Sequence, residues 1–217
     1  MRKACFGPLC AVLLALACAA LAQVTAEERA QGFVPLFNGR DLSGWVVQGG
    51  KNCWSVQNGA IVCSGERGGW LRTEKQYADF IWRLEYKISK RGNSGIFIRA
   101  PKEGRSSMKG FEIQILDDYG KPPTKYSSGS LYRLVAPTKN MSKPAGQWNT
   151  VEITCRGRHI TVVWNGEKTI DVDIDDPELN ASAPANNKPS RRASKGYLGL
   201  QNHRSHVEFR NLRIKEL

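Results

Sequence analysis

The sequence predicts an all-β fold, an antiparallel β-sandwich or jelly roll, from three observations. Short segments in which apolar and polar residues alternate recur along the chain, and residues 80–88 (Phe-Ile-Trp-Arg-Leu-Glu-Tyr-Lys-Ile) are the clearest of them. Tight-turn signals separate these segments, as at Asn58 and Gly59 or at Asn165 and Gly166. Helical periodicity is almost absent. Many short strands without intervening helices favour two packed antiparallel sheets.

The first residues have the pattern of a secretory signal peptide. Arg2 and Lys3 precede an apolar run over residues 11–22 that is too short to span a bilayer, and small residues at its end offer a cleavage site. We therefore expect residues 1–22 to be removed and the mature chain to be exported, to the periplasm or outside the cell. Lipidation at Cys18 is the alternative, although residues 15–17 form a poor lipobox.

Residues 23–217 are expected to form a single domain, because about 195 residues suffice for a substantial core and no low-complexity linker divides them. The expected strands are 54–57, 60–63, 80–88, 95–99, 110–118, 131–135, 148–156, 159–164, 168–172, 197–202 and 207–214. Residues 175–195 are rich in Pro, Ala, Asn and Ser. They predict a long surface loop, either a lid over a site or a plain solvent-exposed excursion.

Three cysteines remain after the signal peptide, Cys53, Cys63 and Cys155, so they cannot all pair internally. A hairpin turning at residues 58–59 would place Cys63 opposite Trp54, and a disulfide to Cys53 would then need a bulge or a shifted register. The alternative is that these cysteines are small buried apolar residues. Their spacing does not resemble a zinc site.

The chain is strongly basic, with a formal charge of +12 that falls to +10 without Arg2 and Lys3. A basic surface could attract anionic polysaccharide, membrane or nucleic acid, and the alternative, which the scattered positions of the basic residues favour, is a merely solvated basic face. Export argues against nucleic acid as a partner, and the basic residues lack the aromatic interleaving of a single-strand binding groove. No membrane span is expected in the mature chain.

Residues 110–118 (Gly-Phe-Glu-Ile-Gln-Ile-Leu-Asp-Asp) are the most informative segment. Phe111, Ile113 and Ile115 share one face of the expected strand, so Glu112 and Gln114 share the other. Any solubilising residue would serve on a merely exposed face. The carboxylate and amide therefore indicate a site, with an ordinary solvated face as the alternative.

Four segments resemble the 3-keto-disaccharide hydrolase domain family: residues 35–45 (Pro-Leu-Phe-Asn-Gly-Arg-Asp-Leu-Ser-Gly-Trp), 93–99 (Asn-Ser-Gly-Ile-Phe-Ile-Arg), 110–117 and 196–203 (Gly-Tyr-Leu-Gly-Leu-Gln-Asn-His). That family shares the concanavalin A-like lectin and glucanase sandwich fold. The resemblance implies an enzyme acting on sugars whose C3 hydroxyl has been oxidised to a ketone, supplied by an upstream sugar 3-oxidoreductase. The ketone acidifies the C2 proton, so a base can start elimination at C1, and water addition completes a net hydrolysis.

This chemistry needs a base, an acid and a hydrogen-bonding or cationic group at the C3 oxygen. We expect the catalytic residues to come from Glu112, His203 and Asp117. Arg99 is expected to bind the ketone oxygen or to pair with Glu112, unless it is only a surface ion-pair partner. The remaining candidates for substrate binding are Trp70, Arg72, Asn93, Gln114, Tyr132 and Gln201. The aromatic candidates could instead belong to the core.

The spacing of Glu112, Gln114 and Asp117 also resembles the Glu-x-Asp-x-x-Glu motif of laminarinase-type glucanases. Here the middle acid is an amide and the last is shorter by one methylene, whereas a retaining glycosidase needs its two carboxyl groups about 5 to 5.5 Å apart. Elimination from a keto sugar is therefore favoured over double displacement. A divalent metal held by Glu112, Asp117 and His203 stays open. So do a lectin-like module that binds a glycan without cleaving it and adhesion to an anionic polymer.

Overall fold

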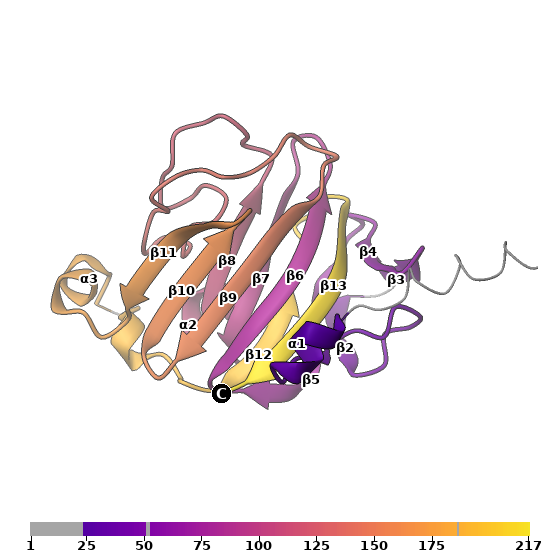
Figure 1. Ribbon diagram of the computed structural model, residues 1–217. Coiled ribbons are helices and arrows are strands. Elements are labelled where there is room, and N and C mark those ends of the chain that lie inside the picture. Colours follow the sequence, from indigo (N-terminus) through magenta and orange to yellow (C-terminus); the bar gives the residue numbers. More distant parts are fainter. Residues whose placement is uncertain (1–23, 51–52, 186) are drawn as a thin grey trace, which may run out of the picture.

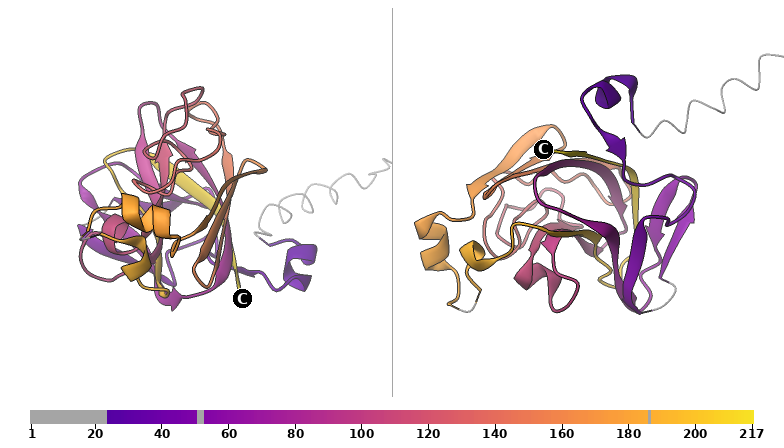
Figure 2. Two further views of the ribbon diagram at one scale, coloured as in Figure 1. Left: turned by 90° about the vertical axis from the view of Figure 1, so that its left-hand side faces the viewer. Right: turned by 90° about the horizontal axis from the view of Figure 1, so that it is seen from below.

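The computed structural model describes residues 24–50, 53–185 and 187–217, and these form two antiparallel sheets packed face to face (Figures 1 and 2). The expected signal peptide, residues 1–22, lies outside the described residues. None of the helices in the described part of the chain has the length and apolar composition needed to cross a bilayer.

The larger sheet contains β11 (Glu167–Asp173), β10 (His159–Trp164), β9 (Asn149–Arg156), β6 (Phe80–Ile88), β13 (Val207–Glu216), β4 (Ala60–Cys63) and β3 (Trp54–Gln57) in this order, and β1 (Val34–Pro35) also pairs with β13. The smaller sheet contains β2 (Trp45–Gly50), β5 (Gly68–Tyr77), β12 (Gly196–Leu200), β7 (Asn93–Ala100) and β8 (Phe111–Leu116). Strands from distant parts of the sequence are therefore neighbours. β12 lies between β5 and β7, which brings residues near position 200 beside residues near positions 70 and 97.

The core lies between the two sheets and follows the alternation in the sequence. Phe80, Trp82 and Leu84 of β6 are buried, while the residues between them are partly exposed. Phe111, Ile113 and Ile115 of β8 are buried from the opposite sheet. This confirms the predicted antiparallel β-sandwich.

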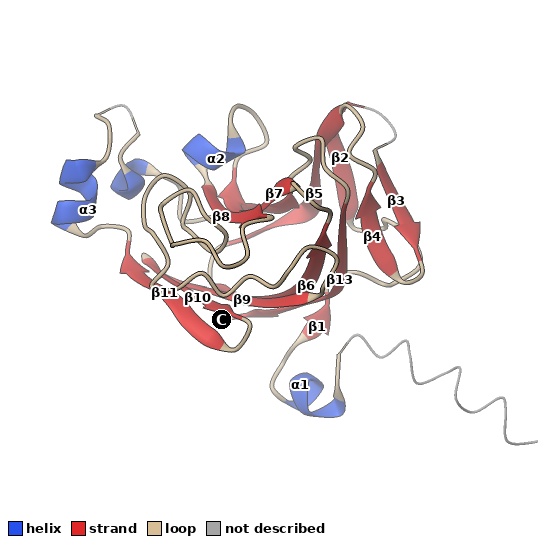
Figure 3. Ribbon diagram, turned by 90° about the horizontal axis from the view of Figure 1, so that it is seen from above, coloured by secondary structure: helices blue, strands red, loops and turns tan. Residues whose placement is uncertain are grey.

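Short helices lie outside the two sheets. α1 (Ala26–Ala30) is on the outer side of the larger sheet, where its Glu28 accepts hydrogen bonds from Arg83 and Arg213 (Figure 1). α2 (Ser106–Lys109) lies on the side of β7 and β8 that faces away from the larger sheet (Figure 3). The expected loop 175–195 joins β11 to β12 and contains α3 (Pro177–Ser182) and a 3-10 turn (Pro189–Arg191).

The predicted turns adopt the expected geometry. Asn58 and Gly59 have φ of 50° and 75°, and Asn165 and Gly166 have φ of 51° and 87°, the left-handed pairs that two-residue hairpins require. The first hairpin places Cys63 opposite Trp54, as expected. Cys53, Cys63 and Cys155 are buried and form no disulfide in the described residues.

Two expectations about strands were wrong. Residues 131–135 form no strand, because Arg133 has φ of 66° and reverses the chain, leaving isolated pairings of Leu131 with Ile113 and with Val135. Conversely, β2 and β5 were not expected. Glycines at the start of β5 and its polar run Thr-Glu-Lys-Gln hide the alternation that identifies a strand.

Candidate active site

The smaller sheet carries a cavity of about 430 Å³ on its outer face, a size typical of ligand sites. Trp70 of β5, Phe97 of β7 and Glu112 and Gln114 of β8 form its floor, because these side chains point away from the core. Its walls come from three connections: residues 104–108 with α2, residues 132–133 after β8, and residues 201–203 after β12. Segments far apart in the sequence therefore meet around one hollow.

Two glycines leave room for side chains of the floor. A Cβ on Gly95 would lie 2.3 Å from Glu112 Oε1, and a Cβ on Gly199 would lie 2.3 Å from Trp70 Cζ3. Any larger residue would therefore displace the carboxyl group or the indole ring. Trp70 and Phe97 meet edge to face, with ring centroids 5.4 Å apart. The result is an aromatic surface beside a carboxyl group, an arrangement suited to the apolar face and hydroxyls of a sugar.

Glu112 is a buried carboxyl group, and the described residues give it no cationic partner. It is only 3% exposed, and its Oε1 accepts a 2.8 Å hydrogen bond from Gln201 Nε2. No ion pair involves it among the residues that the structure describes. Burial raises the pKa of Glu112 from 4.5 to about 8, although the hydrogen bond from Gln201 acts in the opposite direction. A pKa near neutrality suits a group that must take up and release a proton.

The cavity brings together seven of the residues expected from the sequence: Trp70, Asn93, Glu112, Gln114, Tyr132, Gln201 and His203. Gln114 Nε2 donates to Asn93 Oδ1 at 3.0 Å, so these two amides form a pair beside Glu112. His203 is exposed on the wall, and no hydrogen bond engages its ring within the described part of the chain. Because they line one cavity, these residues are candidates for catalysis or substrate binding, and the role of each stays a prediction.

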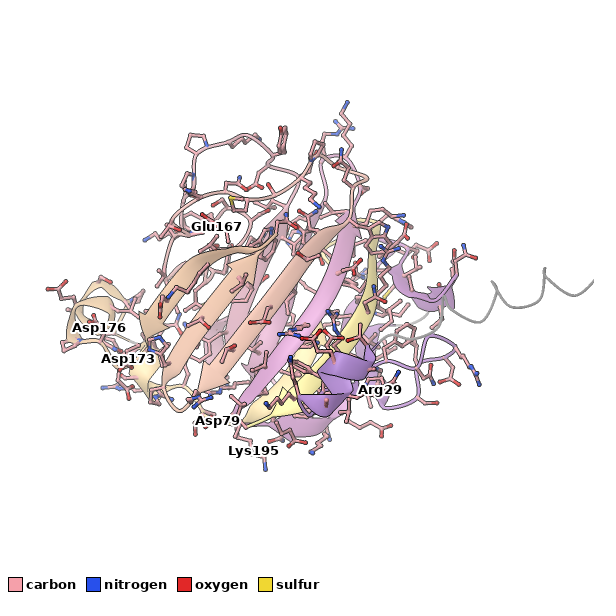
Figure 4. All side chains as sticks on the ribbon, in the orientation of Figure 1. Arg29, Asp79, Glu167, Asp173, Asp176 and Lys195 are labelled. Carbon is pink, nitrogen blue, oxygen red and sulfur yellow. The ribbon has the colours of Figure 1, made fainter. Side chains whose placement is uncertain are left out.

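Arg99 does not line the cavity or contact Glu112, so that expectation was wrong. β7 pairs with β12 at Phe97 and Gly199 and again at Ala100 and Tyr197. Between these two paired positions, β7 has two residues, Ile98 and Arg99, where β12 has only Leu198, and Arg99 has φ of 49°. This bulge breaks the alternation and turns Arg99 into the interior. Its guanidinium donates to Ala78 O and pairs with Asp79 Oδ1 at 3.1 Å. Asp79 is labelled at the lower edge of the molecule in Figure 4.

Asp117 and Arg72 also lie outside the cavity lining. Asp117 Oδ2 accepts a 2.7 Å hydrogen bond from the backbone N–H of Arg91 and holds the turn before β7. Arg72 donates to Gln48 Oε1 and to Thr73 O, and its guanidinium stacks over Tyr197 with 4.4 Å to the ring centroid. Both side chains therefore stabilise neighbouring structure.

The expected metal ligands do not gather. Asp117 is engaged at the turn, away from the cavity that Glu112 and His203 line. Among the described residues, no group of three or more His, Cys, Asp or Glu side chains has an arrangement that would hold a metal ion. These three residues therefore do not fit the metal site that the sequence left open.

Sequence reasoning missed Phe97, Met108, Arg105 and Arg133 as cavity residues. Phe97 could have been found, since it shares a strand face with Gly95. Met108 and Arg105 lie in a connection without periodicity. Arg133 follows Tyr132 in a segment that was expected to be a strand.

Comparisons with known proteins place this geometry in a family. A family model described as a 3-keto-alpha-glucoside-1,2-lyase-like domain matches residues 32–215. A Bacteroides thetaiotaomicron protein named 3-keto-disaccharide hydrolase is 26% identical over 230 aligned positions, which cover 87% of this chain and 79% of that protein.

Solved structures agree on the fold. Two crystal structures of candidate glycosyl hydrolases from Parabacteroides distasonis are similar to this chain. One has a TM-score of 0.79 and 28% identity and covers 89% of this chain and 98% of its own. The other has a TM-score of 0.72 and 26% identity, with coverage of 85% and 99%. The carbohydrate-binding module CBM66 from Bacillus subtilis shares the fold alone, with a TM-score of 0.55, 12% identity and coverage of 80% and 96%.

Proposed function

Because the chain belongs to the 3-keto-alpha-glucoside-1,2-lyase-like domain family, we propose that it cleaves glycosides whose sugar carries a ketone at C3. The name of the Bacteroides thetaiotaomicron relative supports a substrate of this class. The observation that carries the proposal is Glu112, a buried carboxyl group on the floor of a sugar-sized cavity, with a pKa of about 8 and no cationic partner among the described residues.

Glu112 acts as the base that removes the C2 proton. The electron pair of the C2–H bond passes into an enolate at the C3 oxygen. The enolate electrons then form the C1–C2 double bond and restore the C3 ketone as the C1–O bond breaks. The departing oxygen keeps the electron pair of that bond and takes up a proton. Water then adds across the double bond, with hydroxyl at C1 and a proton at C2, so the net reaction is hydrolysis. A base whose pKa is raised by burial has more driving force for the first step.

The other cavity residues take the remaining roles. Trp70 and Phe97 pack against the C–H face of the sugar. The amide of Asn93, oriented by Gln114, donates to the C3 oxygen, where negative charge develops. His203 has no hydrogen-bond partner among the described residues and supplies the proton to the departing oxygen.

We also propose that the mature chain is exported and works after an enzyme that oxidises the C3 hydroxyl. Support for export comes from the charged start and short apolar run of residues 1–22. Support for the oxidising partner is chemical, since ordinary glycosides lack the ketone that the elimination requires.

The test incubates the mature chain with a 3-keto glycoside and with its unoxidised parent. Aglycone is expected from the keto form alone, and the reaction in deuterated water should exchange the C2 proton. Glu112→Gln is expected to lower kcat/KM by about 100-fold or more. Glu27→Gln on the exposed α1 is the matched control and should leave kcat/KM unchanged. Binding of both sugars without product would contradict the proposal and indicate a lectin-like module.

A further inference from the structure

We propose that the natural substrate carries an anionic group, a carboxylate, sulfate or phosphate, on the leaving-group side, and that an arginine-rich extension of the cavity binds it. This deepens the proposed function and rests on it for the place of the leaving group.

A second hollow of about 300 Å³ adjoins the first. Both are lined by Gly68, Asn202 and His203, and the second adds Arg67 and Arg204. Arg105 and Arg133 line the main cavity. We call these four arginines and His203 the basic rim.

The rim arginines lack an acidic partner in the described part of the chain. None of the four forms an ion pair with a carboxylate of the described residues, whereas Arg83, Arg158, Arg210 and Arg213 elsewhere on the surface all do. Glu66 and Glu103 lie close to the rim in sequence but line neither hollow. Among the described residues, Glu112 is the one carboxyl group in either lining. The described part of the two hollows therefore carries four guanidinium groups against a single carboxyl group, an excess of positive charge.

A neutral sugar does not explain this charge. Stacking on Trp70 and hydrogen bonds from the amides of Asn93 and Gln114 are sufficient to hold a neutral ring. Guanidinium groups instead match carboxylate, sulfate and phosphate, to which they donate paired hydrogen bonds. Several arginines around one hollow repel one another until an anion binds there.

The position of the rim indicates which part of the substrate carries the anion. The sugar ring lies over Glu112 and Trp70, and His203 donates to the departing oxygen in the proposed reaction. Since His203 also lines the hollow of Arg67 and Arg204, the leaving group extends toward these arginines. The concave shape favours a soluble anionic glycoside over a flat membrane surface.

The test uses two 3-keto glucosides of nearly equal size, with 3-carboxyphenyl and 3-carbamoylphenyl leaving groups. The wild-type chain is expected to show a KM about 10-fold lower for the carboxylate, and added salt should reduce this preference. The double variant Arg67→Gln, Arg204→Gln should lose the preference while kcat for the carbamoyl compound stays within about 2-fold. Equal KM values for the two compounds in the wild-type chain would overturn the inference.

The matched control is the double variant Arg29→Gln, Arg40→Gln. Arg29 is labelled on α1 in Figure 4, and both residues are exposed and line neither hollow. This variant removes the same charge and should keep the preference. Loss of the preference here as well would mean that overall charge attracts the anion, and would overturn the proposed site.

Binding without turnover separates this inference from the proposed function. Calorimetric titration with the unoxidised carboxyphenyl and carbamoylphenyl glucosides should show tighter binding of the carboxylate, dependent on Arg67 and Arg204, even if no keto glycoside is cleaved. Cleavage of both keto compounds with no such difference in binding would leave the proposed function standing and remove the anion site. Rim-dependent binding to vesicles of phosphatidylglycerol and phosphatidylcholine, without a preference between the glucosides, would indicate a membrane surface and contradict the inference.

Discussion

The amide of Gln201 can form a hydrogen bond with Glu112 in both of its charge states. Its Nε2 donates to Glu112 Oε1, the contact that an ionised carboxylate needs, while its own Oε1 is buried without a hydrogen-bond partner in the described structure. A protonated carboxyl group carries an O–H donor, and a half-turn of the amide would let Gln201 Oε1 accept from it. We therefore expect proton transfer at Glu112 to be coupled to the orientation of this amide.

Replacing Gln201 with leucine removes the one side-chain hydrogen bond that favours the ionised form of Glu112. The pKa of Glu112 should then rise further above its wild-type value of about 8. A base must be ionised, so kcat/KM should increase with pH toward a plateau above about pH 8 in the wild-type chain and at higher pH in Gln201→Leu. Near pH 7 the variant is expected to lose about 10-fold in kcat/KM.

The pH dependence of kcat/KM for both chains checks this expectation. Gln57→Leu, at an exposed position of β3, is the control and should keep the wild-type profile. A profile that falls with rising pH would assign Glu112 the role of acid, and a downward shift in Gln201→Leu would contradict the role given to the amide.

At the scale of strands, regular alternation decides what a sequence can predict. β8 alternates without interruption, so the placement of Glu112 and Gln114 on the face opposite Ile113 could be predicted from the sequence. β7 alternates only as far as Ile98. The bulge at Arg99 then reverses the side-chain direction, and nothing in the residue types of that strand signals it.

The connections that wall the cavity could not be predicted for a different reason. Residues 104–108 and 201–203 have no periodicity, and their positions depend on which strands are neighbours in the folded sheet. His203 was found through the family resemblance, while Arg105 and Met108 had no such signal. The functional face is therefore only partly encoded in local patterns.

Gly95 of β7 lies opposite Gln114, and its substitution tests how strongly the position of Glu112 depends on the sheet beneath it. In Gly95→Ala the new Cβ would overlap Glu112 Oε1, so the carboxyl group must move. We expect kcat for a 3-keto glycoside to fall about 100-fold with a smaller change in KM, because displacement of a reacting group by about 1 Å is costly.

Gly199→Ala is the matched variant, since its Cβ would overlap the ring of Trp70 instead. It should mainly raise KM, because Trp70 contacts the sugar and takes no part in proton transfer. Equal effects of the two substitutions on kcat and KM would mean that both only distort the sheet, and thermal unfolding of each variant measures that distortion directly.

At the scale of the whole molecule, the two sheets differ in what covers their outer faces. The inner face of the larger sheet packs on the core, and α1 lies on part of its outer face (Figure 3), while the cavity lies on the outer face of the smaller sheet. The net charge of +12 could be read from composition, but the grouping of the rim arginines depends on four connections that meet only in the folded chain. Composition alone therefore could not distinguish a binding site for an anion from a solvated basic surface.

The burial of Glu112 should make the stability of the whole fold depend on pH. Its pKa is 4.5 in the unfolded chain and about 8 in the folded one, so the folded state holds the proton more tightly. The contribution of Glu112 to stability is fully present below about pH 4.5 and is lost as pH rises through about 8.

Glu112→Gln keeps the shape of the side chain and cannot ionise. We expect it to unfold at nearly the wild-type denaturant concentration at pH 4, and to be more stable than wild type above pH 8 by an amount on the order of 4 kcal/mol. Urea unfolding of both chains from pH 4 to pH 9 measures this difference, with Glu27→Gln as the exposed control. A constant difference across this range would show that Glu112 titrates normally, and would remove the physical basis for its role as a base.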